Sequence, residues 1–415
     1  MTQPAPTADA FAAIKLPEYR SLLQGRFCFT MGLRMLSTLV GWWLYELTGD
    51  PLAMGLIGLA EVIPAISLAL YAGHVIDTSE KKKLLLRGLF FYLLGAVVLF
   101  AISTTFFTNR YGNTPVIIII YLVIFCTGII RAFVGPSFSA ILGQIVPKSL
   151  LQNAITWNQG TYLSASVAGH ASGGFCIAVL GVNGTMMVIV VLVLLSLFNL
   201  NKLHKSPAKN VAGDKKTWDS VKEGLQFVFN TKEVLGALSL DLFAVLFGGA
   251  VAMVPIYAKD ILKVGAIGFG WLNAATDIGA IFIVVLLTLF PLKKQQGKKL
   301  LFAVAGFGLC IIIFGISKTF WVSFVALLVA GVLDGISVVV RGTIVQLQTP
   351  DEMRGRVMSV NSMFINSSNE LGQFESGVAA KAFGVVPSVV FGGCMTLLVV
   401  CITWLKAPSL KKMEY

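Results

Sequence analysis

The sequence predicts an all-α membrane protein with twelve transmembrane helices in two pseudo-symmetric halves of six helices. Composition is the first reason: 56% of the 415 residues are hydrophobic and 13% are charged. A water-soluble chain carries about 25% charged residues, so a soluble multidomain protein is excluded, and so is a disordered chain. The apolar runs are the second reason. Each lasts about 20 residues or more, as a membrane-spanning helix requires, whereas an outer-membrane barrel has short alternating strands.

The expected spans follow one another with short gaps. In the first half they are residues 20–47, 52–76, 84–106, 115–146, 149–180 and 183–201. In the second half they are residues 234–257, 266–290, 299–317, 320–347, 352–380 and 385–405. The fourth, fifth, tenth and eleventh spans are longer than a bilayer needs, so we expect them to tilt or to extend beyond it.

One long hydrophilic segment, 202–233, separates an N-terminal half, 1–201, from a C-terminal half, 234–415. Apolar residues recur at helical spacing in the second part of this segment. They are Trp218, Val221, Leu225 and Val228. We therefore expect a short amphipathic helix that lies on the cytoplasmic face of the membrane.

Basic residues set the orientation of the spans. The chain has 32 Lys and Arg against 20 Asp and Glu, a net charge of +12. If both termini are cytoplasmic, the outer segments hold few of the basic residues: Arg110, Lys259, Lys263, Lys318 and Lys381. This bias predicts a multi-pass membrane protein with both termini in the cytoplasm. It also accounts for the positive charge without a nucleic-acid partner.

No pattern in the sequence indicates enzymatic, metal or cofactor chemistry. The six cysteines lie in apolar runs without CxxC spacing, and the three histidines are scattered. There is no phosphate loop of the GxxxxGK[ST] kind, and no nucleophile with a base partner stands out. We expect a protein that is not an enzyme and that holds no metal or cofactor.

The two halves resemble each other in sequence. A shift of 203 residues places Gly128 on Gly331 and Asn158 on Asn361. Together with the six-plus-six hydropathy pattern, this repeat indicates two parallel six-helix halves. Such halves rock about a site near the middle of the membrane in transporters, so we expect a small-molecule substrate there.

Charged side chains inside apolar spans are costly and are candidates for the substrate or proton pathway. Those of this chain are Arg34, Glu61, Arg131, Asp241, Asp277, Asp334, Arg341 and Glu370. Under the shift of 203, Arg131 falls on Asp334, so we expect this pair to meet across a central cavity. Arg34 and Asp241 form a looser second pair. The alternative for each is a structural pairing that never meets substrate.

Proton carriage and substrate charge follow from the same residues. A carboxylate in a semi-dry cavity can bind and release a proton, and Asp334 and Asp241 are the first candidates, followed by Glu61 and Glu370. The arginines stay charged and suit an anionic or phenolic substrate.

The eleventh span carries a polar stripe at helical spacing: Asn366, Glu370, Gln373 and Gly377. Such a stripe either lines the pathway or joins helices. Trp42, Trp43 and Tyr45 near the end of the first span suggest an aromatic belt at the outer interface. Phe243 and Phe247 near Asp241 either stack on an aromatic substrate or pack in the core.

Three motifs resemble those of the major facilitator superfamily. The segment from Gly73 through Asp77 to Lys81, Lys82 and Lys83 resembles its G-x-x-x-D-R-x-x-R-[RK] loop, with Thr78 in place of the Arg. The segment from Arg131 to Gly135 resembles the arginine motif of the fourth helix in proton-coupled exporters. The third segment, which resembles the G-P-x-x-G-G antiporter motif, contains Gly169, His170, Gly173 and Gly174. The resemblance implies a loop that latches the halves together and glycines that let helices pack closely.

The resemblance extends over nearly the whole chain to the branch of enterobactin-exporter-like proteins and drug:proton antiporters. The run from Val360 to Gly377 is its most specific part. It implies a monomeric efflux protein of the bacterial inner membrane, surrounded by lipid and driven by the proton gradient. A catecholate siderophore is the first substrate candidate. A drug or macrolide is the alternative, ahead of a lysophospholipid or a sensor that transports nothing.

Overall fold

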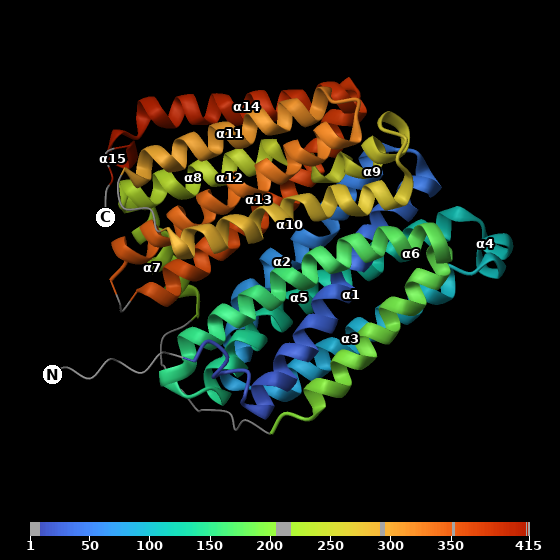
Figure 1. The fold of residues 1–415 in the computed structure, drawn as a ribbon, viewed down its shortest axis with the longest axis horizontal. Helices are drawn as coiled ribbons and strands as arrows, with labels where there is room; N and C mark the ends of the chain where they lie inside the picture. The colour runs from blue at the N-terminus through green and yellow to red at the C-terminus, as the bar shows by residue number, and fades with distance from the viewer. Residues whose placement is uncertain (1–8, 205–216, 291–294, 351–352, 412, 414–415) are drawn as a thin grey trace.

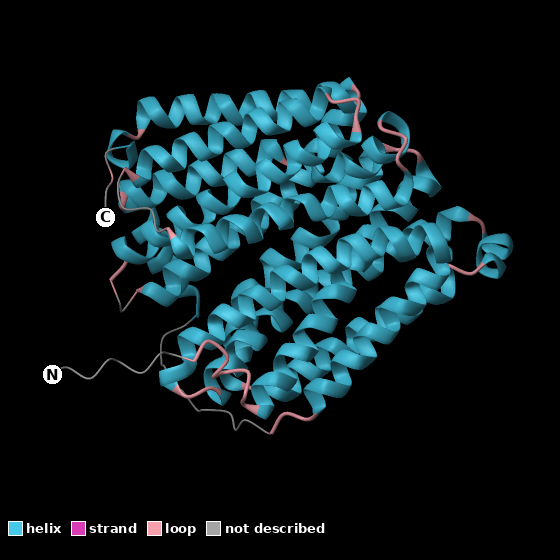
Figure 2. Cartoon of the chain, in the orientation of Figure 1, coloured by secondary structure: helices cyan, strands magenta, loops and turns pink. Residues whose placement is uncertain are grey.

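The computed structural model describes residues 9–204, 217–290, 295–350, 353–411 and 413. Within these ranges, the side chains at 69–70, 73–74, 77–78, 217–221, 355 and 359 are not described. All regular structure in the described ranges is helical, as Figure 2 shows. The predicted all-α fold class is therefore confirmed.

The N-terminal half consists of six α-helices. They are α1 (Pro17–Thr48), α2 (Pro51–Thr78), α3 (Lys81–Ile102), α4 (Thr105–Tyr111), α5 (Asn113–Ile145) and α6 (Leu151–Asn201), with a short 3-10 turn, Lys148–Leu150, before α6. Within α6 the chain breaks at Gly181, where φ is +67°. Glycine adopts this left-handed conformation without a steric penalty, so it ends one arm of α6 and starts the next. The two arms correspond to the expected fifth and sixth spans.

The C-terminal half follows α7 (Thr217–Asn230). Its α-helices are α8 (Lys232–Gly248), α9 (Val254–Ile256), α10 (Gly265–Leu289), α11 (Gln296–Ile316), α12 (Phe320–Gln348), α13 (Arg354–Phe383), α14 (Val385–Lys406) and α15 (Pro408–Lys411). The expected single helix over 234–257 is wrong. It is interrupted after Gly248 by a 3-10 turn, Ala250–Met253, and α9 then continues as a π-helical turn, Tyr257–Ile261. Gly249 has non-helical angles, and Pro255 lacks an amide hydrogen to donate.

Ten helices in the described ranges are long and apolar enough to cross a membrane. Both arms of α6 count as one of these spans, and α13 is not among them. Its polar stripe lowers the mean hydropathy of α13, because side chains that face protein or water need not be apolar. The number twelve therefore stays a prediction.

The helices form two bundles (Figure 1). The blue-to-green helices α1 to α6 pack together, and the yellow-to-red helices from α8 onward form the other bundle. Two helix pairs join the bundles: α2 with α13, which we name the first seam, and α6 with α10, the second seam. We call the end of the molecule with the start of α1 and the end of α14 the proximal face, and the opposite end the distal face.

Glycines bring the backbones together at both seams. A Cβ atom on Gly55 would lie 2.9 Å from Cα of Gly377 in the first seam. A Cβ atom on Gly174 would lie 2.8 Å from Cα of Gly270 in the second. The shift of 203 that relates the halves carries Gly174 onto Gly377. The two seams are therefore built on the same close crossing of small residues.

The helix α7 has an apolar side covered by protein. Val228 is fully buried in a cluster with Val234, Val345 and Val357 of the C-terminal half, and Leu225 packs against it. Arg356 of α13 forms an ion pair with Glu223. An amphipathic helix is present, as expected, but α8, α12 and α13 cover these apolar residues instead of lipid. The side chains of Trp218 and Val221 lie outside the described residues.

The expected outer aromatic belt is wrong. Trp42, Trp43 and Tyr45 are all buried. The Trp42 ring stacks on Phe269 of α10 with 5.8 Å between centroids. The Tyr45 hydroxyl donates a hydrogen bond to Asp260, which lies in the π-helical turn. The aromatic residues therefore face the other half, because the end of α1 lies at the junction between the bundles rather than on the lipid side.

Candidate functional site

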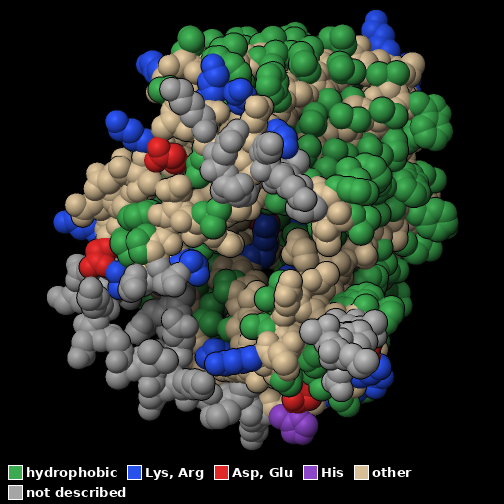
Figure 3. Space-filling model, turned by 60° about the vertical axis from the view of Figure 1, so that its left-hand side comes forward, with side chains coloured by type: hydrophobic (Ala, Val, Ile, Leu, Met, Phe, Trp, Pro, Cys, Tyr) green, Lys and Arg blue, Asp and Glu red, His purple; other side chains and the backbone are tan. Residues whose placement is uncertain are grey.

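A cavity of about 500 Å³ lies between the two bundles. Its walls come from α1, α2, α3, α5 and α6 on one side and from α8, α10, α12 and α13 on the other. The polar side chains that line it are Arg34, Ser37, Glu61, Tyr92, Thr127, Arg131, Tyr162, His170, Asn273, Thr276, Asp277, Asn366, Asn369, Glu370 and Gln373. Figure 3, with the proximal face turned toward the viewer, shows a hollow between the bundles.

The distal end of the cavity is closed by contacts between the halves. Lys381 at the end of α13 donates to Asp50, which precedes α2, with 2.6 Å between Nζ and Oδ2. The hydrogen bond from Tyr45 to Asp260 lies at the same end, as do the glycine crossings of both seams. The structure thus has one closed and one hollowed face, as expected of one state in an alternating-access cycle.

Three charged side chains meet inside the first seam, and we name them the ionic cluster. Arg131 of α5 has its Nη1 atom 2.5 Å from Oε1 of Glu61 on α2. The same atom lies 3.7 Å from Oε1 of Glu370 on α13. Gln373, one turn further along α13, donates to the other oxygen of Glu370 at 3.0 Å. The cluster therefore joins the N-terminal half to the C-terminal half at the wall of the cavity.

The charge of the ionic cluster does not balance when both carboxyl groups are ionised. One guanidinium faces two carboxylates, which leaves one negative charge. Two carboxylates that share a site repel each other, so one proton or one cation nearby is favoured. The cluster can thus release a proton and accept a cation in its place, while Arg131 stays beside Glu61 and Glu370.

The expected pair between Arg131 and Asp334 is wrong. Asp334 lies on α12, outside the cavity lining, and its carboxylate has no hydrogen bond or ion pair among the described residues. Pseudo-symmetric residues lie on opposite sides of the axis between the halves, so they meet only if both side chains reach that axis. Arg131 instead meets carboxylates on the helices beside its own.

The expected pair between Arg34 and Asp241 is wrong as well. Asp241 on α8 forms an ion pair with Arg341 on α12, inside the C-terminal half. Their side chains are 8% and 2% exposed, respectively. A carboxylate and a guanidinium buried this deeply must neutralise each other, and removal of either leaves an uncompensated charge. Neither residue lines the cavity, so the pair is a structural one in this state.

Arg34 lies in the cavity with a tyrosine as its partner. Its Nη2 atom donates to the Tyr162 hydroxyl at 2.7 Å, and its guanidinium also lies 5.7 Å from the centre of that ring. The Nε atom of Arg34 is buried without a hydrogen-bond partner. This donor therefore has no acceptor in the wall of the cavity as the structure describes it. Arg26, which is closer to the start of α1 and to the proximal face, donates a hydrogen bond from Nη1 to Oδ1 of Asn158 at 2.8 Å.

The second seam has a hydrogen-bonded cluster in place of an ion pair with arginine. Ser166 of α6 donates to Oδ2 of Asp277 on α10 at 2.5 Å. His170 places Nε2 3.7 Å from the same oxygen and Nδ1 2.8 Å from the hydroxyl of Thr38 on α1. His170 is buried, with 8% of its surface exposed. Asp277 is therefore a cavity carboxylate whose described partners are a hydroxyl and an imidazole.

The glycines of the antiporter-like motif face neighbouring helices. A Cβ on Gly169 would lie 2.6 Å from the carbonyl oxygen of Met31, and a Cβ on Gly173 would lie 3.3 Å from Cα of Met35. Gly174 faces Gly270, as described above. Three glycines on one arm of α6 thus let both α1 and α10 approach it.

The loop between α2 and α3 is only partly described. Gly73 and Asp77 belong to α2, but their surroundings and the side chain of Asp77 are not described. Lys82 donates to the carbonyl oxygen of Asn201 at 2.8 Å, and Lys83 lies 2.7 Å from Glu80. Lys81 is 8% exposed. Lys82 also donates to the carbonyl oxygen of Leu203. None of these partners of Lys82 and Lys83 belongs to the C-terminal half, so these two lysines do not latch the halves together here.

Sequence reasoning placed Asn366, Glu370 and Gln373 on one face of a helix, and all three line the cavity. Phe243 and Phe247 do not line it. Sequence reasoning missed Asn273, Thr276 and Ser166. The signal for Asn273 was its position four residues before Asp277 in an apolar span, which puts both on one face.

Comparisons with known proteins agree with this fold. The sequence profile of the family described as "Transmembrane secretion effector" matches residues 8–415. The uncharacterized MFS-type transporter YfmI of Bacillus subtilis is 21% identical over 401 residues, which cover 92% of this chain and 94% of YfmI. The multidrug efflux pump Tap of Mycobacterium bovis is 22% identical over 395 residues, 90% of this chain and 89% of Tap.

Solved structures agree on the fold alone. A bacterial homologue of the human lysosomal transporter Spinster, inward-facing and unoccupied, has a TM-score of 0.72 at 14% identity, with 96% of this chain and 98% of that chain covered. A POT family transporter in complex with 5-aminolevulinic acid has a TM-score of 0.73 at 11% identity, with 95% and 96% covered. The family match covers nearly the whole chain and the bundles have the expected arrangement, so this chain belongs to the transmembrane secretion effector family and is a transporter of the major facilitator superfamily.

Proposed function

We propose that the protein exports an amphipathic organic solute by alternating access, with protons moving inward as the energy source. The observation that carries this proposal is the ionic cluster at the wall of a cavity between two halves. A site with one unbalanced negative charge accepts either a proton or a cationic solute. Competition for that charge couples the flux of protons to the flux of solute, because the proton must leave before the solute binds, and the solute before the proton.

The orientation of the cavity follows from the basic residues. Their bias supports a location of the proximal face, which carries the lysines at the start of α3, in the cytoplasm of a bacterium with the protein in its inner membrane. The hollowed face then admits a solute from the cytoplasm. Export requires the first and second seams to separate at the distal face while the proximal face closes.

The charges that line the cavity favour a cationic solute. Two arginines, Arg34 and Arg131, stand against three carboxylates, Glu61, Asp277 and Glu370. Arg131 is already engaged by two of them. Asp277 has no described lysine or arginine within ion-pair distance, although the charge of Arg34 acts on it, and it is a further carboxylate that attracts a cationic solute into the cavity. The relative named as a multidrug efflux pump supports export of drugs.

A catecholate siderophore is the second candidate. The buried Nε atom of Arg34, which has no partner, favours it, because this donor fits a phenolate or carbonyl oxygen. The aromatic ring of Tyr162 beside it suits a flat ring in the solute. The two candidates differ in sign of charge, so one experiment separates them.

The test is proton flux in proteoliposomes with an imposed pH gradient and an internal pH dye. A cationic dye, a macrolide and a catecholate are added in turn. We expect flux with the dye or the macrolide, and loss of that flux in Glu61→Gln. Glu375→Gln is the matched control, because Glu375 lies on α13 but outside the cavity lining. Flux with the catecholate alone would establish the second candidate, and no flux with folded protein would refute proton-coupled export of these solutes.

A further inference from the structure

Two carboxyl groups from opposite halves meet where the first seam is tightest. A Cβ atom on Gly58 of α2 would lie 2.3 Å from the carbonyl oxygen of Glu370 on α13, so the two backbones almost touch there. Glu61 follows Gly58 by three residues and therefore lies on the same side of α2, one turn nearer the proximal face. Its carboxyl group lies within hydrogen-bonding distance of the Glu370 carboxyl group. The close crossing thus brings two acidic groups together.

Arg131 does not separate these carboxyl groups. Helix α5 crosses α2 closely at Gly128, whose Cβ would lie 2.8 Å from the carbonyl oxygen of Glu61. Arg131, one turn along α5, reaches the pair from this side, with Nη1 2.5 Å from Oε1 of Glu61 and 3.7 Å from Oε1 of Glu370. One cation compensates one carboxylate. The second carboxyl group then keeps a proton, and a hydrogen bond from carboxyl to carboxylate joins the halves.

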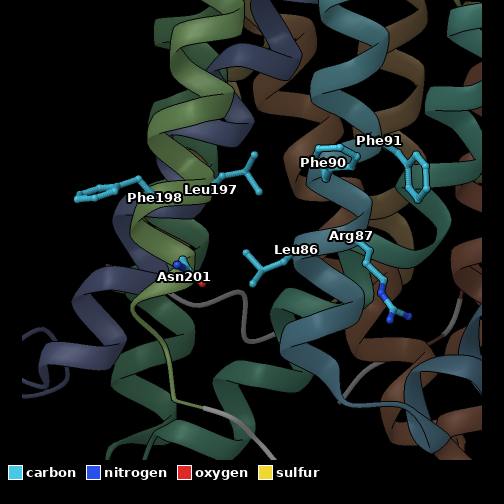
Figure 4. A pocket seen from close by; sticks show the side chains of 7 residues that line it. All are labelled: Leu86, Arg87, Phe90, Phe91, Leu197, Phe198 and Asn201. Carbon is cyan, nitrogen blue, oxygen red and sulfur yellow. The ribbon is translucent and has the colours of Figure 1, made fainter.

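Few other titratable groups of the N-terminal half face the pair. The charge of Arg34 on α1 acts on Glu370, but its guanidinium donates to Tyr162. On α3 the polar group toward the cavity is Tyr92, which is 1% exposed and whose hydroxyl has no partner among the described residues. The opposite side of α3 is apolar and lines a recess on the outer surface, with the side chains that Figure 4 shows: Leu86, Phe90 and Phe91.

The C-terminal half brings no further positive charge to the pair among the described residues. Gln373 donates to Oε2 of Glu370 at 3.0 Å. Asp334 on α12 and Glu375 on α13 lie outside the cavity lining. Charged groups on α7 and α8, which pack against α13, have other partners: Glu223 is paired with Arg356, and Asp241 with Arg341. The contact between the two carboxyl groups therefore depends on the proton between them.

A proton and an ammonium group carry the same charge but need different amounts of space. In a hydrogen bond between a carboxyl and a carboxylate, the two oxygens are about 2.5–2.7 Å apart. An ammonium group lies about 2.7–2.9 Å from each oxygen that it binds, so two carboxylates on either side of it are about 5 Å apart. Replacement of the proton by a solute ammonium group therefore lengthens the contact between Glu61 and Glu370 by about 2 Å.

We propose that Glu61 and Glu370 share one proton in the distal-closed state, and that a cationic solute opens the distal face by taking the place of this proton. This inference rests on the proton-driven export proposed above. Glu370 is buried and has little room to turn away, so a longer contact moves α2 and α13 apart. Binding of a proton then closes the distal face and carries the proton inward. Binding of the solute opens that face and releases the solute outward.

The test measures the distance between spin labels at the distal face of the purified full-length protein, without solute. Asn109→Cys on α4 and Ala382→Cys on α13, two exposed positions in opposite halves, carry the labels after the six native cysteines are changed to alanine. We expect a short distance at about pH 6 and a longer one by about pH 9, because loss of the shared proton leaves two carboxylates that repel each other. Folded protein whose distances do not change with pH would overturn the proposal.

Two variants separate a shared proton from a structural contact. In Glu61→Gln the amide donates permanently to Glu370, so the distal face should stay closed and the response to pH should be lost. Glu61→Asp keeps the acid but draws it back by one methylene group, so the shared proton is held less tightly. The pH at which the distance changes should therefore fall by about one unit, which is about tenfold in proton affinity.

Glu375→Gln is the matched control, because Glu375 lies on the same helix as Glu370 but outside the cavity lining. It should respond to pH as the unchanged protein does. A response to pH that survives in Glu61→Gln, or that is lost equally in the control, would contradict a proton shared by Glu61 and Glu370.

The space that the cation needs is tested at about pH 7. A cationic dye should increase the long-distance population about threefold or more, whereas a neutral analogue of the dye should not. Equal responses to the two would refute opening by charge replacement. These readouts need no transport. Solute-driven proton flux without a response of the distances to pH would refute this inference alone. A response to pH without flux would refute export and leave the shared proton standing.

Discussion

The two seams between the halves share a backbone design and differ in their charges. Both cross at paired glycines, Gly55 with Gly377 and Gly174 with Gly270. Toward the cavity, the first seam contains an arginine between two carboxylates, whereas the second contains a carboxylate that accepts a hydrogen bond from a serine and lies 3.7 Å from a histidine. Repeated architecture therefore sets how closely the halves approach, and the individual side chains decide what each seam does during the cycle.

This difference assigns separate roles to the two seams. A cluster with an unbalanced charge responds to protons and cations, so the first seam is the one we expect to couple ion and solute. The hydrogen bonds of the second seam are weaker individually and hold Asp277 in place for a solute. Five substitutions, in order of decreasing effect, test that division.

The largest effect is expected from Glu370→Gln. This change balances the charge of the ionic cluster permanently, so neither a proton nor a cation is exchanged there. Proton flux driven by solute should fall about tenfold or more, corresponding to about 1.4 kcal/mol or more in a rate-limiting equilibrium. Glu375→Gln, on the same helix, should keep the flux. Unchanged uphill transport in Glu370→Gln would remove the first seam from the coupling mechanism.

The next effect is expected from Gly58→Ala in the first seam. The new Cβ would lie 2.3 Å from the carbonyl oxygen of Glu370, which is a backbone atom that cannot turn away. We expect a loss of about 1–3 kcal/mol in distal closure, read as a lower unfolding midpoint and a longer distance between spin labels on the two halves.

Gly174→Ala tests whether a side chain in the second seam is as costly as one in the first. Its Cβ would lie 2.4 Å from the carbonyl oxygen of Ala266. A loss of similar size is expected there. Gly143→Ala is the control for both, since nothing lies within 4 Å of a Cβ at that position. If Gly143→Ala lowers the unfolding midpoint as much as Gly58→Ala and Gly174→Ala do, the effect does not come from the seams.

A smaller effect is expected from His170→Gln in the second seam. Glutamine keeps a donor and an acceptor at this position, so at most about 1 kcal/mol of hydrogen bonding to Thr38 is lost. Transport of the cationic dye should stay within about threefold of the unchanged protein, since that factor corresponds to under 1 kcal/mol. A loss as large as that of Glu370→Gln would mean that the second seam also carries the coupling.

The smallest effect is expected at the distal rim, from Asp50→Asn. The hydrogen bond from Lys381 holds the pKa of the Asp50 carboxyl below its ordinary value of 3.8, and the amide of Leu52 acts in the same direction. Because the pKa is lowered in the folded state, the pair stabilises it fully above about pH 4 and loses this contribution as the pH falls further.

Both partners at this rim are partly exposed, so we expect less than about 1 kcal/mol. The measurement is the difference in unfolding midpoint between Asp50→Asn and the unchanged protein. It should be constant from about pH 7 to 5 and shrink below about pH 4. A difference that grows in acid would show that the rim is not held by an ionised Asp50.

The polar stripe of α13 shows what helical periodicity in the sequence can predict and what it cannot. Asn366, Glu370 and Gln373 share a face because helical spacing fixes it, and the cavity lies on that face. Periodicity does not say which neighbour a side chain meets. Arg131 was matched with Asp334 by the internal repeat, yet it binds Glu61 and Glu370, because the seam brings α2 and α13 beside α5.

Sequence by itself determined the membrane environment, the all-α class, the polar segment between two similar halves and most of the candidate charges. These follow from local quantities: hydropathy over a span, helical spacing and the cost of a charge in lipid. Only the tertiary structure decided the partners of those charges, the burial of Trp42 and Tyr45, and the closed distal face. These depend on which helices are neighbours, and that is set by the packing of small residues such as Gly55 and Gly174 across the whole length of the chain.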